Sequence, residues 1–225
     1  MNRYVRQEIL GEIGVSGQEK IRKAKVAVVG VGGLGSVCAE LLVRAGVGSL
    51  LLIDKDVVSL VNLHRQFSFK EGDVGKSKVF VLKDYLSKVN SGVSISVVED
   101  FLHEKNTGVL DGFDLVLDCS DNMLARRVIN SYCSSSGKPW IHAAASGVVG
   151  NVLFVSDSSV FDKFFRSGES FGDCSEVGVL NSLPVLIASV QVSQAIRFIV
   201  DGSFCEGLIR INPWLSSFDV FDVKN

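Results

Sequence analysis

A cluster of glycines separates an apolar run from a segment with helical spacing. Gly30, Gly32, Gly33 and Gly35 follow the valine-rich residues 25–29. Glycine lets the backbone turn tightly and approach phosphate oxygens, which the free N–H groups and the dipole at a helix N-terminus attract. A glycine turn between a strand and a helix therefore predicts a nucleotide-binding site. A glycine-rich structural turn without a ligand is the alternative.

An acidic residue stands at the end of the next apolar run. Asp54 closes residues 49–54 and lies 24 residues beyond Gly30. In dinucleotide-binding folds, a carboxylate at this place accepts hydrogen bonds from the ribose hydroxyl groups. On its own, this fingerprint indicates a nicotinamide-dependent dehydrogenase.

The residues after Asp54 carry more positive charge than a dinucleotide needs. Asn62, Arg65 and Lys78 follow it at irregular spacing. A pyrophosphate is largely satisfied by a helix N-terminus, whereas a triphosphate carries more negative charge and needs cations held in place. These residues therefore favour a triphosphate over a nicotinamide cofactor. A solvated charged loop is the alternative for Arg65 or Lys78 taken alone.

Strands and helices alternate along the first part of the chain. Such alternation indicates an α/β fold in which a parallel sheet is covered on both faces. We predict a single unit over residues 1–225, with a Rossmann-like nucleotide-binding half at about 1–145 and a mixed or antiparallel half at about 146–225. The predicted strands are 25–30, 49–54, 93–98, 114–118, 140–144, 151–155, 208–211 and 218–223, and the predicted helices are 16–24, 36–45, 76–90, 122–134 and one from about 183.

Short polar and glycine-containing motifs occur in a fixed order from the N-terminus. They are Arg3-Tyr-Val-Arg6-Gln7, Gly30-x-Gly-Gly-Leu-Gly35, Asp54-x-Asp56, Asn62-Leu-His-Arg65-Gln66, Gly75-Lys-Ser-Lys78 and Asp118-Cys-Ser-Asp121-Asn122. In this order the motifs resemble those of the ThiF/MoeB/HesA family, the bacterial relatives of ubiquitin-activating enzymes. The resemblance extends over nearly the whole chain, and it does not fix the branch of the family.

The resemblance implies an enzyme that binds ATP and magnesium. Such enzymes adenylate the C-terminal glycine carboxylate of a small ubiquitin-like sulfur-carrier protein and release pyrophosphate, and a separate sulfur donor protein then supplies sulfur. A thiamin-type carrier is slightly preferred over a molybdopterin-type carrier, on the small size of the chain and on Cys174. The alternatives are adenylation of another peptide or small-molecule carboxylate, a nicotinamide-dependent oxidoreductase, and a partner-binding protein without activity.

The resemblance also assigns residues to the nucleotide. Asp54 is implied to hold the ribose, and Asn62, Arg65 and Lys78 the phosphates. The implied nucleotide-binding residues are Gly30, Gly32, Gly33, Gly35, Asp54, Asn62, Arg65, Lys78, Asp121 and Asn122.

The resemblance implies catalytic roles for Arg6, Asn62, Arg65, Lys78 and Asp121. Asp121 matches the magnesium ligand; the alternative is that it only caps the helix that follows. Arg6 matches an arginine that reaches across a homodimer to the neighbouring active site. The alternative for Arg6 is a surface arginine on a disordered arm.

Cysteine usage departs from the family. Many members bind structural zinc with two Cys-x-x-Cys pairs, whereas the five cysteines here form no such pair, so we expect no zinc. Without that anchor we expect residues 157–176 to be mobile. Cys174 in this stretch matches the loop cysteine that can link covalently to the carrier in thiamin-type members and is not needed for adenylation in molybdopterin-type members. An inert side chain is the alternative, because neighbouring acids disfavour a thiolate. Cys38 and Cys119 are predicted to be buried structural residues.

Charge and hydropathy exclude several classes of protein. The formal net charge of −2 argues against a nucleic-acid binder that relies on bulk positive charge. The charged N-terminus lacks the apolar core of an export signal. The apolar stretch Val177–Val200 is interrupted by polar residues, which favours a buried helix over a membrane span. Together with the unpaired cysteines, these features favour a reducing, cytoplasmic location.

Overall fold

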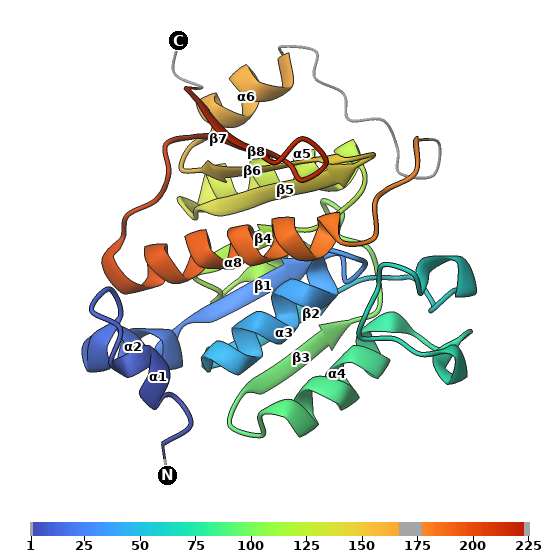
Figure 1. The fold of residues 1–225 in the computed structure, drawn as a ribbon, viewed down its shortest axis with the longest axis horizontal. Helices are drawn as coiled ribbons and strands as arrows, with labels where there is room; N and C mark the ends of the chain where they lie inside the picture. The colour runs from blue at the N-terminus through green and yellow to red at the C-terminus, as the bar shows by residue number, and fades with distance from the viewer. Residues whose placement is uncertain (1, 167–176, 223–225) are drawn as a thin grey trace.

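The computed structural model describes residues 2–166 and 177–222 (Figure 1). The strands of this part of the chain are β1 Lys25–Val29, β2 Ser49–Ile53, β3 Ser94–Val98, β4 Leu115–Asp118, β5 Trp140–Ser146, β6 Val149–Val155, β7 Gly207–Asn212 and β8 Ser217–Asp222. Its helices are α1 Val5–Glu8, α2 Gly14–Lys23, α3 Gly35–Ala45, α4 Lys78–Val89, α5 Met123–Ser136, α6 Ser158–Arg166 and α8 Leu183–Asp201, with 3-10 turns η1 Leu60–Asn62, η2 Glu71–Asp73 and η3 Thr107–Leu110. The sequence pattern does not predict α1, α6 or the 3-10 turns.

The described strands form one sheet with two halves. The strand order is β3-β2-β1-β4-β5-β6-β7-β8. The strands from β3 to β5 are parallel. The pairs β5–β6, β6–β7 and β7–β8 are antiparallel. The predicted α/β fold is confirmed, including its change from a parallel half to an antiparallel half.

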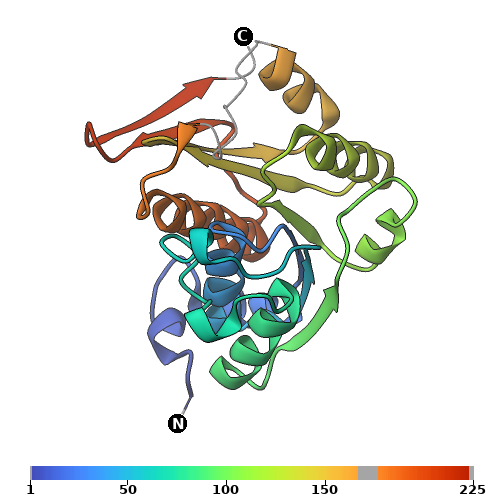
Figure 2. The same ribbon diagram turned by 90° about the vertical axis from the view of Figure 1, so that its right-hand side faces the viewer.

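Helices cover both faces of the sheet (Figure 2). The core of one face includes residues of α2, α3, α4 and α8, and the core of the other includes residues of α5 and α6. Every residue of β4 is buried, as are all residues of β1 except Lys25. Strands covered on both faces need apolar side chains on both sides, which is why they appear in the sequence as continuous apolar runs.

The last strand is exposed along most of its length. Phe218, Val220 and Phe221 of β8 are between 47% and 59% exposed. β8 pairs only with β7 in the described sheet, so its other edge is uncovered there. The alternation of apolar and acidic residues near the C-terminus therefore predicts this exposed strand correctly.

The expectation of a mobile segment over residues 157–176 is wrong for its first part. Residues Ser158–Arg166 form α6, whose Phe161 and Phe164 are buried. The ring of Phe161 lies 5.6 Å from that of Trp140 in β5, so aromatic packing holds the helix against the sheet. The remainder of that stretch, including Cys174, lies outside the described residues.

The long apolar helix α8 packs against the sheet and two other helices. By length and composition alone, α8 could span a membrane. It packs against α2, α3, β5 and β6, however, and carries the fully buried Gln191 near its middle. These contacts are those of a core helix, as the polar interruptions of the apolar stretch predict.

Gln191 uses its whole amide to tie α8 to the sheet. Its Nε2 donates to the carbonyl oxygens of Asp118 at 3.0 Å and Ile141 at 2.8 Å, at the ends of β4 and within β5. Its Oε1 accepts from the thiols of Cys38 at 3.2 Å and Cys119 at 3.3 Å. The Gln191 side chain therefore fixes the positions of α8, β4, β5 and α3 relative to each other.

Replacing this amide should destabilise the fold strongly. Gln191→Leu leaves two buried carbonyl groups without their donor, and each unsatisfied buried group costs about 1–3 kcal/mol. We expect the free energy of unfolding in urea to fall by about 2–4 kcal/mol. Ser193→Leu, at an exposed position of the same helix, is the matched control and should change stability by less than about 0.5 kcal/mol. Equal losses in the two variants would contradict this role of Gln191.

Candidate functional site

A cavity of about 590 Å³ opens where the strand order reverses between β1 and β4. Ligands of open α/β sheets bind at this switch point, beyond the carboxyl ends of the strands. The volume lies within the range of small-molecule and cofactor sites. Of the residues predicted from the sequence, those in its wall are Gly30, Gly32, Gly33, Asp54, Asn62, Arg65, Lys78, Asp121 and Asn122.

The glycines serve two different purposes. Gly30 has φ of +85°, and a Cβ there would lie 2.8 Å from the carbonyl oxygen of Cys119. A Cβ at Gly35 would lie 1.8 Å from the carbonyl oxygen of Gly30, so Gly35 closes the turn and does not line the cavity. Gly32 and Gly33 form the wall itself, where glycine lets a ligand approach the backbone.

Asp54 is held in place by backbone donors. Its carboxylate accepts hydrogen bonds from the N–H of Val31 and the N–H of Asp56, both at 2.8 Å. Burial raises the pKa of Asp54, and the charge of Lys78 and the two N–H donors oppose this shift. A carboxylate has about four lone-pair sites, so this group keeps acceptor capacity for ribose hydroxyl groups.

The predicted phosphate-binding residues meet on one side of the cavity. Arg65 donates from Nη2 to Oδ1 of Asn62 at 3.2 Å. Lys78 donates from Nζ to Oδ2 of Asp56 at 3.0 Å. The Lys78 side chain is only 4% exposed, whereas that of Asp56 is 54% exposed. Lys78 is therefore a buried cation in the cavity wall rather than part of a solvated loop, and Asp56 is its partner.

Asp121 stands free of the capping role that the sequence also allows. The N-cap of α5 is Asn122, whose Oδ1 accepts from the N–H of Ala125 at 2.9 Å. Asp121 is exposed at the cavity wall, where its Oδ1 accepts a long hydrogen bond from Nδ2 of Asn122 at 3.4 Å. Within residues 2–166 and 177–222, no three His, Cys, Asp or Glu side chains gather around a metal position. Because Mg²⁺ at nucleotide sites needs one or two carboxylates plus phosphate oxygens, one free carboxylate fits it.

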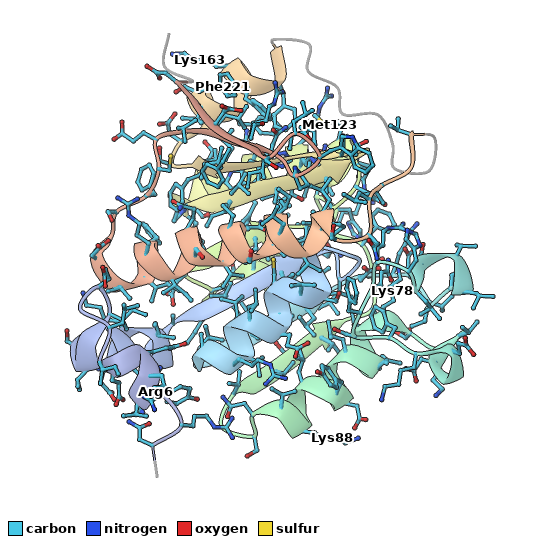
Figure 3. All side chains as sticks on the ribbon, viewed as in Figure 1. Arg6, Lys78, Lys88, Met123, Lys163 and Phe221 are labelled. Carbon is cyan, nitrogen blue, oxygen red and sulfur yellow. The ribbon has the colours of Figure 1, made fainter. Side chains whose placement is uncertain are left out.

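Arg6 does not join the cavity of its own subunit. It lies on α1, and Figure 3 shows it on the opposite side of the molecule from Lys78. The arm is folded: Asn90 donates from Nδ2 to the hydroxyl of Tyr4 at 2.8 Å, and Arg3 donates to the carbonyl oxygen of Val89 at 3.1 Å. The alternative of a disordered arm is thus wrong. A role for Arg6 in catalysis requires a second subunit.

The sequence does not predict a role for three buried polar residues near the cavity. Arg126 lines the cavity and is 6% exposed, while Asp118 and His142 are fully buried. Nδ1 of His142 lies 2.7 Å from Oδ2 of Asp118, and Nε of Arg126 lies 3.5 Å from the same oxygen. Asp118 appears in the resemblance only as part of a motif. The sequence indicates an inward position for Arg126 only by its spacing, because it lies four residues after Asn122, one turn into the predicted helix.

The charges of this group balance each other. Burial alone would raise the pKa of Asp118, but the His142 hydrogen bond and the Arg126 charge together hold it below the usual value. Burial lowers the pKa of His142 despite its bond to Asp118. Asp118 is therefore ionised beside the Arg126 cation, and His142 is neutral at pH 7 with its proton on Nδ1. The other nitrogen, Nε2, is buried without a hydrogen-bond partner near the rings of Phe164 and Phe165.

Two cysteines lie beneath the glycine turn, as predicted for structural residues. Cys38 and Cys119 are buried free thiols whose sulfur atoms are 3.9 Å apart. Burial raises the pKa of Cys119 well above its usual value. A thiol that resists ionisation is a poor nucleophile, so Cys119 belongs to the frame of the site rather than to its chemistry.

Comparison with known proteins relates the chain to adenylating enzymes. The ThiF family pattern matches residues 4–225. The "Adenylyltransferase and sulfurtransferase MOCS3" of Culex quinquefasciatus is 35% identical over 96% of this chain and 51% of its own length. This chain thus spans about half the length of that relative. The "Molybdopterin-synthase adenylyltransferase" of Salmonella typhimurium is 36% identical over 88% of this chain and 82% of its own. The "SAMP-activating enzyme E1" of Haloferax volcanii is 34% identical, covering 89% and 76%.

Solved structures share the fold at lower sequence identity. A crystal structure of E. coli MccB with ATP covers 99% of this chain and 72% of that chain, with a TM-score of 0.83 and 24% identity. A crystal structure of PaaA covers 98% and 72%, with a TM-score of 0.78 and 21% identity. At these identities the likeness establishes the architecture alone.

The lowered pKa of His142 gives folding a defined pH dependence. In the unfolded chain this residue takes up a proton as the pH falls through about 6.5, whereas in the folded protein it does so only at lower pH. The free energy of unfolding therefore has its full contribution from His142 above about pH 6.5 and decreases as the pH falls below it. The slope is at most about 1.4 kcal/mol per pH unit for one proton. His142→Asn should show a smaller difference in the free energy of unfolding between pH 7.5 and pH 5.5.

The exposed His64 provides the matched control. Urea unfolding of His64→Asn should follow the wild-type pH dependence over the same range. If His142→Asn also shows the wild-type pH dependence of the free energy of unfolding, the assignment of His142 as a buried neutral residue is wrong.

Proposed function

The chain belongs to the ThiF family, and we propose that it is an ATP-dependent adenylyltransferase for the C-terminal carboxylate of a ubiquitin-like sulfur-carrier protein. The observation that carries this proposal is the composition of the cavity wall. It combines the ribose-binding acid Asp54, the cations Arg65 and Lys78, and the free carboxylate of Asp121 in one space. A nicotinamide cofactor would give the cations and the free carboxylate no evident use.

The proposed reaction needs no general base. A C-terminal carboxyl group has a pKa of about 3.3–3.7 in model peptides, so it is an ionised nucleophile at neutral pH. One carboxylate oxygen attacks the α-phosphorus of ATP, the bond from that phosphorus to the bridging oxygen breaks, and pyrophosphate leaves. The main obstacle is repulsion between the carboxylate and the triphosphate. Cations and in-line positioning therefore supply most of the rate enhancement.

The polar residues predicted from the sequence have specific roles in this proposal. Asp54 accepts hydrogen bonds from the ribose, and the backbone of Gly33 lies against the nucleotide. Asn62, Arg65 and Lys78 hold the phosphates. Arg65 and Lys78 offset the phosphate charge by exchanging their hydrogen bonds to Asn62 and Asp56 for phosphate oxygens. Magnesium bound to ATP would supply further positive charge, and Asp121 is the residue that would hold it.

The names of the relatives bear on the carrier. The three curated relatives are named for molybdopterin synthase, for MOCS3 and for SAMP activation. The preference for a thiamin-type carrier has no support among them. We therefore propose a molybdopterin-type carrier that ends in Gly-Gly. The covalent role of Cys174, which the resemblance implies for thiamin-type members and which adenylation in molybdopterin-type members does not need, stays a prediction.

Asp121 tests the proposed chemistry directly. Asp121→Ala should reduce carrier-dependent ATP–pyrophosphate exchange by about 10³-fold or more, because the metal and the developing charge lose their anchor. Far-UV circular dichroism and thermal unfolding should match the wild type, since Asp121 is exposed and Asn122 keeps the cap of α5. Exchange at the wild-type rate would exclude Asp121 as the magnesium ligand.

A homodimer would bring Arg6 to a neighbouring cavity, and we propose this assembly. Val5, Ile9, Leu10 and Val15 lie on and between α1 and α2 beside Arg6 and are 45–68% exposed. Apolar side chains gathered on one surface are typical of an interface. If a partner subunit covers this surface, its own cavity can receive Arg6.

Subunit mixing tests the proposed role of Arg6. An Arg6→Ala subunit keeps an intact cavity, and an Asp121→Ala partner supplies the missing arginine. Randomly exchanged dimers should recover about a quarter of the wild-type exchange activity, since half are mixed and each mixed dimer has one complete site. The control pairs Asp121→Ala with Lys78→Ala, which damage the same cavity and should not complement. No recovery with Arg6→Ala, once subunit exchange is demonstrated, would mean that Arg6 does not act in the partner's site.

A further inference from the structure

Ser120, the residue before Asp121, is held from both sides by one buried ion pair. Oδ1 of Asp118 accepts hydrogen bonds from the N–H of Ser120 at 3.0 Å and from its hydroxyl at 2.5 Å. Nη2 of Arg126 donates to the carbonyl oxygen of Ser120 at 3.1 Å. The peptide groups on both sides of Ser120 therefore have fixed partners.

The two residues that hold Ser120 are bound to each other. Nε of Arg126 lies 3.5 Å from Oδ2 of Asp118, and their side chains are 7% and 0% exposed. His142 donates to the same carboxylate oxygen at 2.7 Å from Nδ1, at the register position that pairs β5 with β4. Charges that are buried and paired in this way keep their geometry, because separating them would leave an uncompensated charge out of water.

The hydrogen bonding of the Arg126 guanidinium is incomplete. Among the residues that the structure describes, Nε faces Oδ2 of Asp118 at 3.5 Å but makes no hydrogen bond, and Nη1 donates to the sulfur of Met123 at 3.7 Å. Buried donors in native proteins nearly always find partners, so an arginine placed only for stability would be expected to use them. Arg126 keeps these unsatisfied donors at the wall of the cavity, next to the segment that carries Asp121.

We propose that Asp118 and Arg126 are positioning residues that clamp Ser120 and thereby set the carboxylate of Asp121 for the magnesium ion bound to ATP. The inference rests on the proposed function, because it assumes that Asp121 is the metal ligand. Residues behind a metal ligand orient it, and their loss typically lowers metal affinity by about 10–100-fold. Neither Asp118 nor Arg126 needs to touch the nucleotide in this role.

Equilibrium binding separates positioning from direct contact. The affinity of the protein for α,β-methylene-ATP is measured by calorimetry in MgCl₂ and in EDTA, and the ratio of the two affinities is the magnesium coupling. Arg126→Gln should lower this coupling by about tenfold and leave the affinity in EDTA within about twofold of the wild type. A large fall of the affinity in EDTA would show that Arg126 binds the nucleotide itself and would overturn the inference.

The neighbouring arginine is the matched control. Arg127 lies on the same helix and carries the same charge, but it is exposed. Arg127→Gln should keep the wild-type coupling. If the coupling falls as much in Arg127→Gln as in Arg126→Gln, the effect comes from the net charge of α5, and the inference is overturned.

Asp121→Asn separates the inference from the function on which it rests. This variant should lose most of the coupling. If it keeps the coupling, both the metal assignment and the inference fail. If it loses the coupling while Arg126→Gln keeps it, the inference alone fails.

A paired substitution covers the case in which Arg126→Gln does not fold. Asp118→Asn combined with Arg126→Gln removes both buried charges together, which avoids leaving one of them unpaired. This double variant should also lose about tenfold in coupling, with its affinity in EDTA retained. Wild-type coupling in the folded double variant would overturn the inference.

Discussion

The close approach of the glycine turn to the end of β4 is the constraint on which the site depends. There is no room for a side chain at Gly30 against the carbonyl of Cys119, or at Gly35 against the carbonyl of Gly30. The turn, the start of α3 and the end of β4 therefore pack as one unit. Gln191 joins this unit to α8 through the carbonyl of Asp118 and the thiol of Cys119. The cavity wall has its shape because these backbone segments cannot move apart independently.

Charge is arranged differently on the two sides of the cavity. On the side of η1 and α4, Arg65 is paired with a neutral amide and Lys78 with the half-exposed Asp56. Phosphate oxygens can replace such partners at little cost, since the displaced groups remain close to water. On the side of α5, Arg126 is locked to the buried Asp118. A buried ion pair does not readily rearrange. One side is suited to exchange its partners for a ligand, and the other to stay fixed while the ligand binds.

Much of this site could be predicted from the sequence because its residues follow strand ends. Asp54 and the glycine turn come directly after β2 and β1, and parallel strands bring their carboxyl ends to one edge of the sheet. The positions of Arg126 and His142 could not be predicted in the same way. His142 meets Asp118 only through the register of β4 with β5, and the phase of α5 alone decides that Arg126 points inward and Arg127 outward. The helix α6 was missed because its support comes from aromatic packing on β5 and not from a zinc site.

The most direct test of the account concerns the chemical group that is activated. Carrier-dependent ATP–pyrophosphate exchange is measured with a molybdopterin-type carrier ending in a Gly-Gly carboxylate, and with the same carrier ending in a Gly-Gly carboxamide. The proposed reaction requires an ionised carboxylate as nucleophile, so exchange is predicted with the first carrier and not with the second. Equal exchange with the carboxamide, or exchange without any carrier, would contradict adenylation of a carrier C-terminus.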